Sequence, residues 1–159
     1  MAIPDFVLAL REKIGTVPLW ISGVTAVVVR DSGERRDVLM VRRADTGAWT
    51  PVTGIIDPGE QPAVAAAREV KEEADVVAVP VRFSRLGVTD EIVYANGDRA
   101  QYIDHTFLFE YVSGEPFPAD GENTEARWFP ADELPEMSPD MAERVDAALS
   151  GEREARFDS

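Results

Sequence analysis

The strongest constraint on the fold is one helix-forming segment that lies between two groups of β-rich runs. The segment PAVAAAREVKEEA, residues 62–74, contains no glycine and no internal proline, and most of its residues are strong helix formers. Before it, residues 23–31 and 37–43 are rich in valine and other strand formers, and the polar stretch 32–36 separates them. This order predicts a β-hairpin followed by a single long helix.

A second hairpin is predicted after the helix. Residues 81–95 and 98–112 flank Asn96-Gly97, a dipeptide favoured in type I′ turns because both residues accept positive φ. Three shorter elements complete the chain, namely an amphipathic leading helix that stops at Gly15, a strand at 126–129 and a helix at 139–149. Helices placed between groups of mostly antiparallel strands predict the α+β class with a mixed sheet.

The length and composition indicate one globular domain that needs neither disulfide bonds nor a structural metal ion. A chain of 159 residues can bury a sizeable core, and it contains no cysteine. This excludes cysteine proteases, thiol redox enzymes and cysteine-ligated metal sites. We expect a single domain over 1–159, with an N-terminal helical extension at 1–20 and a frayed polar tail at 151–159.

The charge of the chain limits its partners. There are 16 basic and 30 acidic residues, and the formal net charge is -14. Nucleic acid polymers and anionic lipids would be repelled by this surface, so a phosphate-bearing ligand must come with cations. The first 15 residues lack the basic start and long apolar run of a secretory signal, and no later stretch approaches the ~20 apolar residues of a membrane span. We therefore expect a soluble, cytoplasmic protein.

Three acids of the central helix fall on one arc. At about 100° per residue, Glu69, Glu72 and Glu73 project together, while Arg68 and Lys71 are predicted to lie off that arc. Like charges at these spacings destabilise a helix by roughly 0.2–0.5 kcal/mol per pair, so a further cation is expected. Mg²⁺ suits carboxylate oxygens and usually completes its coordination with substrate phosphates. A glutamate-rich helix face is also commonly only solvated, and the arc alone does not decide between these readings.

The residues around the arc favour the metal site. The segment GIIDPGEQPAVAAAREVKEEADV resembles the Nudix box, G-x(5)-E-x(7)-R-E-U-x-E-E-x-G-U, where U is a bulky aliphatic residue. The matching positions are Gly54, Glu60, Arg68, Glu69, Val70, Glu72, Glu73 and Val76. Asp75 stands where the family has glycine; the helix ends there and positive φ is expected, which Asp tolerates better than most residues.

The resemblance implies both a fold and a chemistry. The fold is an α/β/α sandwich around a mixed sheet, and the reaction is hydrolysis of a nucleoside diphosphate linked to another moiety. Glu69, Glu72 and Glu73 would bind Mg²⁺, with Mn²⁺ as an alternative, and the carbonyl of Gly54 would be a further ligand. By the same resemblance, the remaining box residues Arg68 and Glu60 would hold the metal-binding acids in place.

The family often takes its general base from a box glutamate or from a later loop. In this chain the loop DGENTEARWF contains Glu122 and Glu125. We favour Glu122, because it lies in a glycine-containing loop that can move onto the site, whereas Glu125 adjoins the predicted strand. Either acid could equally be a solvated loop residue, and Glu73 remains a catalytic candidate within the box.

Substrate contacts are predicted from aromatic and basic residues. A nucleobase needs an aromatic platform, and the candidates are Trp20, Trp49, Tyr94 and Tyr102. Arg42 and Arg43 alternate faces, so one of them could reach a phosphate, and the sequence does not choose between them. We name Trp49, Arg42 and Tyr102 as the substrate-binding set. His105 shares a strand face with apolar residues, which favours a packed structural histidine.

Two classes of function compete. The intact acids favour a metal-dependent diphosphate hydrolase over a nucleotide-sensing module that has lost turnover. An isomerase on the same fold would need a cysteine. The box is common to many substrates; we expect an ADP-ribose-like nucleoside diphosphate compound, with a nucleoside triphosphate as the alternative. A homodimer is left open.

Overall fold

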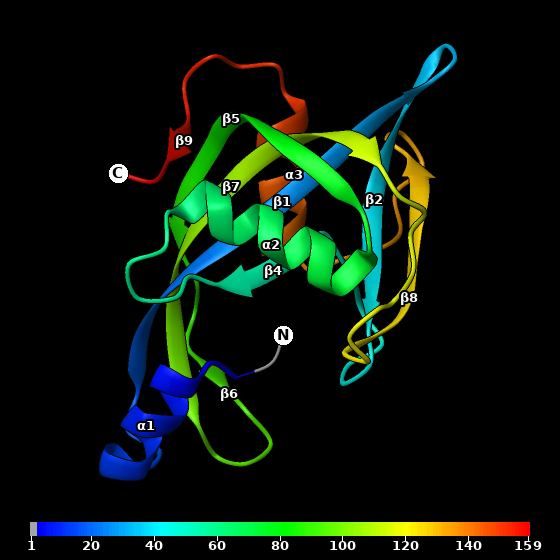
Figure 1. Cartoon of the computed structure of the whole chain (residues 1–159). Coiled ribbons are helices and arrows are strands. Elements are labelled where there is room, and N and C mark those ends of the chain that lie inside the picture. The colour runs from blue at the N-terminus through cyan, green and yellow to red at the C-terminus, as the bar shows by residue number, and fades with distance from the viewer. Residues whose placement is uncertain (1–2) are drawn as a thin grey trace.

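The computed structural model describes residues 3–159, which form three helices and one nine-stranded sheet (Figure 1). The helices are α1 (Asp5–Ile14), α2 (Pro62–Ala74) and α3 (Pro139–Leu149). The strands are β1 (Leu19–Ser32), β2 (Arg35–Arg43), β3 (Trp49–Thr50), β4 (Val52–Ile55), β5 (Val77–Val88), β6 (Ile92–Val93), β7 (Arg99–Ser113), β8 (Asn123–Pro130) and β9 (Arg156–Phe157). No helix within these residues is long and apolar enough to cross a bilayer.

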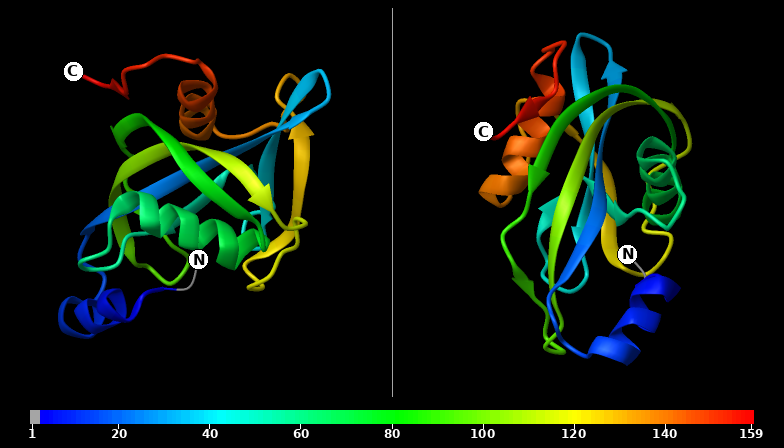
Figure 2. Two further views of the ribbon diagram at one scale, coloured as in Figure 1. Left: turned by 45° about the horizontal axis from the view of Figure 1, so that its top comes forward. Right: turned by 90° about the vertical axis from the view of Figure 1, so that its left-hand side faces the viewer.

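The sheet is mixed and lies between two helices. Its main path is β3-β2-β1-β7-β5-β9, with β4 on β1, β6 on β7 and β8 on β2. The two central strands, β1 and β7, run parallel, whereas β1 and β2 form the predicted antiparallel hairpin. Figure 2 shows α2 and α3 on opposite faces of the sheet. The predicted α+β fold and its three-layer arrangement are therefore confirmed.

Alternation along the strands builds a separate core on each face. Successive residues of a strand point to opposite faces, so neighbouring valines of β1 enter different cores. The core under α2 contains Val24, Val28, Leu39, Val41, Val52, Val70 and Phe109. The core under α3 contains Val27, Val29, Val38, Met40, Val145 and Ala148. Because both faces of β1 are buried along its middle, residues 26–29 are consecutive apolar residues.

The predicted leading helix is present as α1 and packs at one end of the sheet (Figure 1). Its buried residue Val7 joins Ile21, Ile55 and Ala100 in a third apolar cluster. From the same helix, the Arg11 guanidinium donates to the carbonyl of Arg99 on β7 at 2.7 Å. Of the predicted extension over 1–20, residues 1–2 lie outside the described residues.

The loop at Asn96-Gly97 differs from the predicted type I′ turn. Gly97 has a φ of 87°, but among residues 3–159 only Asp75 is a non-glycine residue with positive φ, so Asn96 is not. The Gly97 N–H donates to the Tyr94 carbonyl at 2.9 Å, and Tyr94 N–H donates to Asp98 at 2.9 Å. The loop thus has three residues rather than two, and only its last residue needs positive φ.

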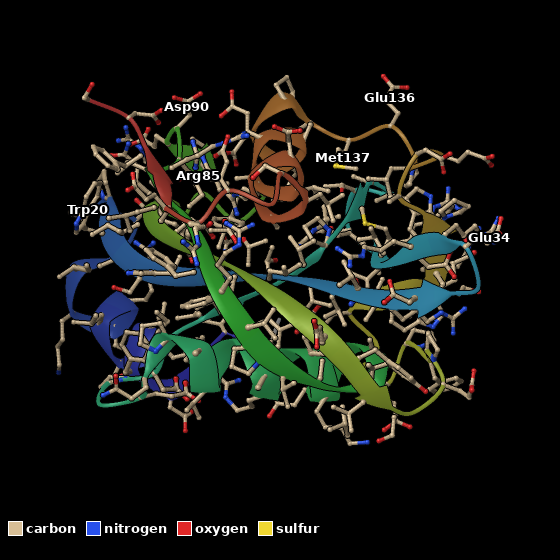
Figure 3. All side chains as sticks on the ribbon, turned by 90° about the horizontal axis from the view of Figure 1, so that it is seen from above. Trp20, Glu34, Arg85, Asp90, Glu136 and Met137 are labelled. Carbon is tan, nitrogen blue, oxygen red and sulfur yellow. The ribbon has the colours of Figure 1, made fainter. Side chains whose placement is uncertain are left out.

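The prediction of a frayed C-terminal tail is wrong. Arg156 and Phe157 form β9, which pairs in parallel with β5. Arg156 also pairs with Asp146 of α3 at 2.6 Å. The Arg85 guanidinium of β5 lies between the tail and α3, with Asp158 at 3.3 Å and Glu143 at 3.2 Å (Figure 3). Sequence polarity concealed these contacts because they are ionic rather than apolar.

Candidate metal and catalytic site

The ends of α2 are set by residues that suit them. Pro62 occupies the start of the helix, where its missing N–H costs nothing. The helix stops at Asp75, which adopts the left-handed conformation with φ 53° and ψ 28° and donates its N–H to the Lys71 carbonyl. The Lys71 ammonium also pairs with the Asp75 carboxylate. The predicted positive φ at Asp75 is confirmed.

Gly54 allows β4 to approach α2 closely. A Cβ atom at this position would lie 2.2 Å from side-chain carbons of Glu69, so only glycine fits the observed geometry. Glu69 is buried beside it, and burial raises the pKa of its carboxyl group while the charge of Arg68 opposes that shift. The close approach brings the backbone of β4 next to the first acid of the arc.

Arg68 connects three glutamates and the backbone. Its guanidinium donates to both oxygens of Glu60 at 3.0 and 2.9 Å, to Glu69 at 2.9 Å and to Glu72 at 3.0 Å. It also donates to the carbonyl of Ile55 at 3.1 Å. The hydrogen bonds from Arg68 lower the pKa of Glu60. The expectation that Arg68 lies off the acidic arc is therefore wrong, because Arg68 is four residues before Glu72 and residues at this spacing are neighbours on a helix.

The arc itself divides between a buried and an exposed part. Glu69 and Glu73 are 5% and 3% exposed, whereas the Glu72 side chain is 53% exposed. Burial raises the pKa of Glu73 to about 7. Two acids of the box thus face inward, and the third lies at the surface with Arg68.

The inward-facing Glu73 meets the loop before β8. Carboxylate oxygens of Glu73, Asp120 and Glu122 all lie within 4.8 Å of one another. The side-chain amide of Asn123 donates to Oε2 of Glu73 at 3.2 Å. Sequence analysis anticipated Glu73 and Glu122 but missed Asp120 and Asn123, because a loop acid or amide in so acidic a chain carries no distinctive signal.

Main-chain hydrogen bonds fix this loop against α2. The N–H groups of Phe117 and Ala119 donate to the carbonyls of Ala74 and Glu73 at 3.0 and 3.3 Å. Ala44 donates to the carbonyl of Glu122 at 2.8 Å. We expected a loop that can move onto the site; in the structure it is already docked at the end of α2 (Figure 1).

Glu125, Arg42 and Trp49 belong to a different group of residues. Both oxygens of Glu125 accept from arginines, Arg42 at 3.0 Å and Arg127 at 2.7 Å. The Arg127 guanidinium lies 4.9 Å from the centre of the Trp49 ring, which packs into the core under α3. Trp49 also meets the Phe129 ring at 4.9 Å. The structure does not bring Arg42 or Trp49 to the carboxylates of α2.

Tyr102 and Arg43 lie on the side of the box instead. A Cβ at Gly23 would be 3.2 Å from the Tyr102 ring and 3.4 Å from the Gly54 carbonyl oxygen, which places ring and carbonyl next to the same residue. The Tyr102 hydroxyl is 2.7 Å from the hydroxyl of Tyr94, and burial raises its pKa. Asp45 raises the pKa of Arg43, and the charges of Glu73 and Tyr94 act in the same direction.

The remaining candidate, His105, packs against the backbone of β1 and the ring of Phe83. Its Nδ1 lies 3.0 Å from the Gly23 carbonyl oxygen. Its ring centre lies 6.3 Å from that of Phe83. These contacts agree with the predicted structural histidine.

The comparisons with known proteins agree with the geometry. The sequence model of the NUDIX domain matches residues 21–148. A MutT-like protein of Streptomyces ambofaciens is 34% identical over 143 residues, which cover 88% of this chain and 84% of that protein. The NAD-capped RNA hydrolase NudC of Deinococcus radiodurans is 28% identical over 73% of this chain, and the match spans only 39% of its length.

A solved structure gives the same fold at lower identity. The crystal structure of an ADP-ribose pyrophosphatase from Streptococcus suis superposes with a TM-score of 0.62. The match covers 87% of this chain and 98% of that one, with 23% sequence identity. This likeness establishes the shared architecture of the sheet and its two covering helices.

Proposed function

The chain belongs to the Nudix hydrolase family, and from this premise we propose that it hydrolyses the diphosphate of an ADP-ribose-like compound in a reaction that depends on Mg²⁺ or Mn²⁺. The observation that carries the proposal is the gathering of Glu73, Asp120 and Glu122 within 4.8 Å next to the buried Glu69. So many carboxylates near one another call for a hard cation. A bound ion would shield the diphosphate oxygens and lower the pKa of the attacking water.

The donor set fits a hard divalent ion because every candidate ligand is an oxygen. Glu69, Glu73 and the carbonyl of Gly54 come from the box, and Asp120 and Glu122 come from the docked loop. Glu72 stays a predicted ligand, although its carboxylate accepts from Arg68. Arg68, which is itself hydrogen-bonded to Glu60, donates to Glu69 and would fix the orientation of that carboxylate.

Glu122 is the proposed general base that takes the proton of the water. It lies in the carboxylate cluster, whereas both oxygens of Glu125 are engaged by arginines. Glu73 is the second candidate, because a pKa of about 7 suits proton transfer near neutral pH. Replacing Glu122 by Gln distinguishes the role of general base from that of metal ligand.

A general base at Glu122 predicts a fall in kcat of about 10²- to 10⁴-fold with little change in substrate KM, and loss of the acidic limb of the pH profile. If Glu122 is instead a metal ligand, the Glu122→Gln variant should have a weaker apparent Mg²⁺ affinity, and high Mg²⁺ should restore part of its rate. Wild-type kinetics over the full pH and Mg²⁺ series would eliminate both roles and transfer the base assignment to Glu73.

The substrate is proposed from the relatives and from the residues beside the box. The names of two relatives refer to ADP-ribose and to NAD caps, and both compounds contain adenosine diphosphate joined to a second sugar. Tyr102, paired with Tyr94, offers an aromatic surface near Gly54 for the nucleoside end. For the phosphates we propose Arg43 rather than Arg42, because Arg42 is held by Glu125 and the Gly47 carbonyl, whereas Arg43 lies opposite Asn123, which contacts Glu73.

The test is a panel of compounds with Mg²⁺, scored for phosphate-bearing products. We expect ADP-ribose or a related nucleoside diphosphate compound to be turned over fastest, and chelation with EDTA to abolish turnover. A nucleoside triphosphate as the best substrate would select the alternative reaction, pyrophosphate release. Tight nucleotide binding without turnover of any compound would select the sensing role.

A further inference from the structure

We propose that Asn123 is a positioning residue that holds the Glu73 carboxylate for divalent-metal binding. The inference rests on the proposed function of the same site. Asn123 is the first residue of β8 and is 7% exposed, and its Nδ2 donates to Oε2 of the buried Glu73 at 3.2 Å. The Asn123 amide is therefore a buried hydrogen-bond donor to Glu73, the acid of α2 that lies beside the acids of the loop before β8.

The chemistry of an amide suits this position better than a cationic side chain would. Arg68 already serves Glu60, Glu69 and Glu72, and Arg43 makes a two-point contact with Asp45 at 2.9 and 2.6 Å. A lysine or arginine on Glu73 would neutralise the charge that a metal ion needs. The amide of Asn123 carries no net charge, so it can fix the orientation of the carboxylate without competing for that charge.

An irregularity in the sheet turns Asn123 toward Glu73. In the pairing of β2 with β8, Arg42 lies opposite Glu125 but Arg43 lies opposite Asn123, which leaves Thr124 as an extra residue. In a regular strand, residues 123 and 125 would share one face. The bulge sends Glu125 to the arginines near Trp49 and Asn123 to the acids of α2. Re-aiming a side chain beside an active site is a common role of such bulges.

The proposal predicts a defect in metal binding that can be measured without substrate. We would titrate the full-length protein with Mn²⁺ and follow the free ion by electron paramagnetic resonance. Replacing Asn123 by Leu preserves size but removes the donor, and the Mn²⁺ affinity should fall by about 10- to 100-fold, as for other residues that orient metal ligands. Asn123→Val, which also lacks a side-chain donor and suits a strand, should show the same loss if the Leu variant does not fold.

A double-mutant cycle with Glu73 distinguishes positioning from a general structural effect. If Asn123 acts through Glu73, then Asn123→Leu should cause no further loss of Mn²⁺ affinity in a Glu73→Ala background. Thr124→Val is the matched control from the same bulge, because the Thr124 hydroxyl contacts only the Arg42 carbonyl, at 3.4 Å, among the side-chain bonds of residues 3–159. Its Mn²⁺ affinity should stay within about twofold of wild type.

The outcomes separate this inference from the function on which it rests. Wild-type Mn²⁺ affinity in folded Asn123→Leu and Asn123→Val, together with a loss in Glu73→Ala, would overturn the role of Asn123 alone. Additive losses in the double variant would also overturn it. If wild type binds no Mn²⁺, both proposals fail.

Discussion

The two faces of the sheet differ in how positive and negative side chains are balanced. Under α3, the Asp104 carboxylate accepts from Thr25 and Thr106 at 2.7 Å each and from Arg144 at 3.0 Å, and both charged side chains are at most 5% exposed. One buried cation meets one buried anion. Under α2, a single guanidinium, Arg68, serves three glutamates, and Glu73 lies beside two further acids.

This difference distinguishes a structural network from the proposed metal site. A buried carboxylate that is paired with a buried guanidinium and hydrogen-bonded to two hydroxyl groups stabilises the fold and offers little to a ligand. A buried excess of carboxylates costs stability unless a cation completes it. The gathering of acids under α2 therefore supports the proposed metal site, which burial alone would not indicate.

The largest expected effect concerns the balanced face. Arg144→Met leaves Asp104 as an uncompensated buried charge, and the free energy of unfolding should fall by about 3–5 kcal/mol. Urea denaturation measures this change, and turnover per folded molecule should remain normal. A loss of turnover at full stability would place Arg144 in the site and break the distinction between the faces.

On the acid-rich face, the expected effect is on rate. Glu73→Gln keeps the volume but removes one charge from the cluster, and kcat should fall by about 100-fold or more, equivalent to about 2.7 kcal/mol. Glu125→Gln is the matched control, because Glu125 is held by arginines away from the cluster. Near-normal kcat in Glu73→Gln at saturating Mg²⁺ would show that the acids of the helix are misassigned.

The same residue gives the metal-free protein a pH dependence. Because burial raises the pKa of Glu73 to about 7 from its ordinary value of 4.5, its contribution to stability is complete below about pH 4.5 and is lost as the pH rises through about 7. As the pH falls from about 8 to about 6, the free energy of unfolding of wild type should rise by about 1 kcal/mol relative to that of Glu73→Gln. Thermal denaturation in EDTA measures the difference; parallel curves for the two proteins would contradict a raised pKa.

The smallest expected effect is at the end of α2. Asp75→Gly relieves the positive φ but removes the pair with Lys71 and adds backbone entropy to the unfolded chain, so stability should change by no more than about 0.5 kcal/mol. Asp75→Val, a β-branched residue at the same φ, should lose more than about 1 kcal/mol. Equal stabilities of these two variants in urea would remove the conformational explanation.

The sequence predicted those parts of the molecule that depend on local rules. Helix α2, the first hairpin and the conformation of Asp75 follow from propensity, periodicity and the known tolerance of aspartate for positive φ. Gly54 was placed by the resemblance, and the structure supplies the reason in its contact with Glu69.

What could not be predicted depends on contacts between distant segments. The bulge that separates Asn123 from Glu125 arises in the pairing of β8 with β2, and no local signal marks it. Strand alternation correctly placed Arg42 and Arg43 on different faces but could not say which face would carry α2. The tail pairs with β5 as a strand, and Arg85 of β5 also pairs with Asp158, but these charged residues look solvated in the sequence.

The attachment of the loop before β8 has a consequence for how such proteins diverge. Its hold on α2 uses the main-chain N–H groups of residues 117 and 119, which almost any amino acid supplies, proline excepted. The loop sequence can therefore drift over generations while its acids stay beside the helix. New substrate preferences could then be acquired there without rebuilding the proposed metal site, and two descendants could keep one architecture while little in this stretch still aligns.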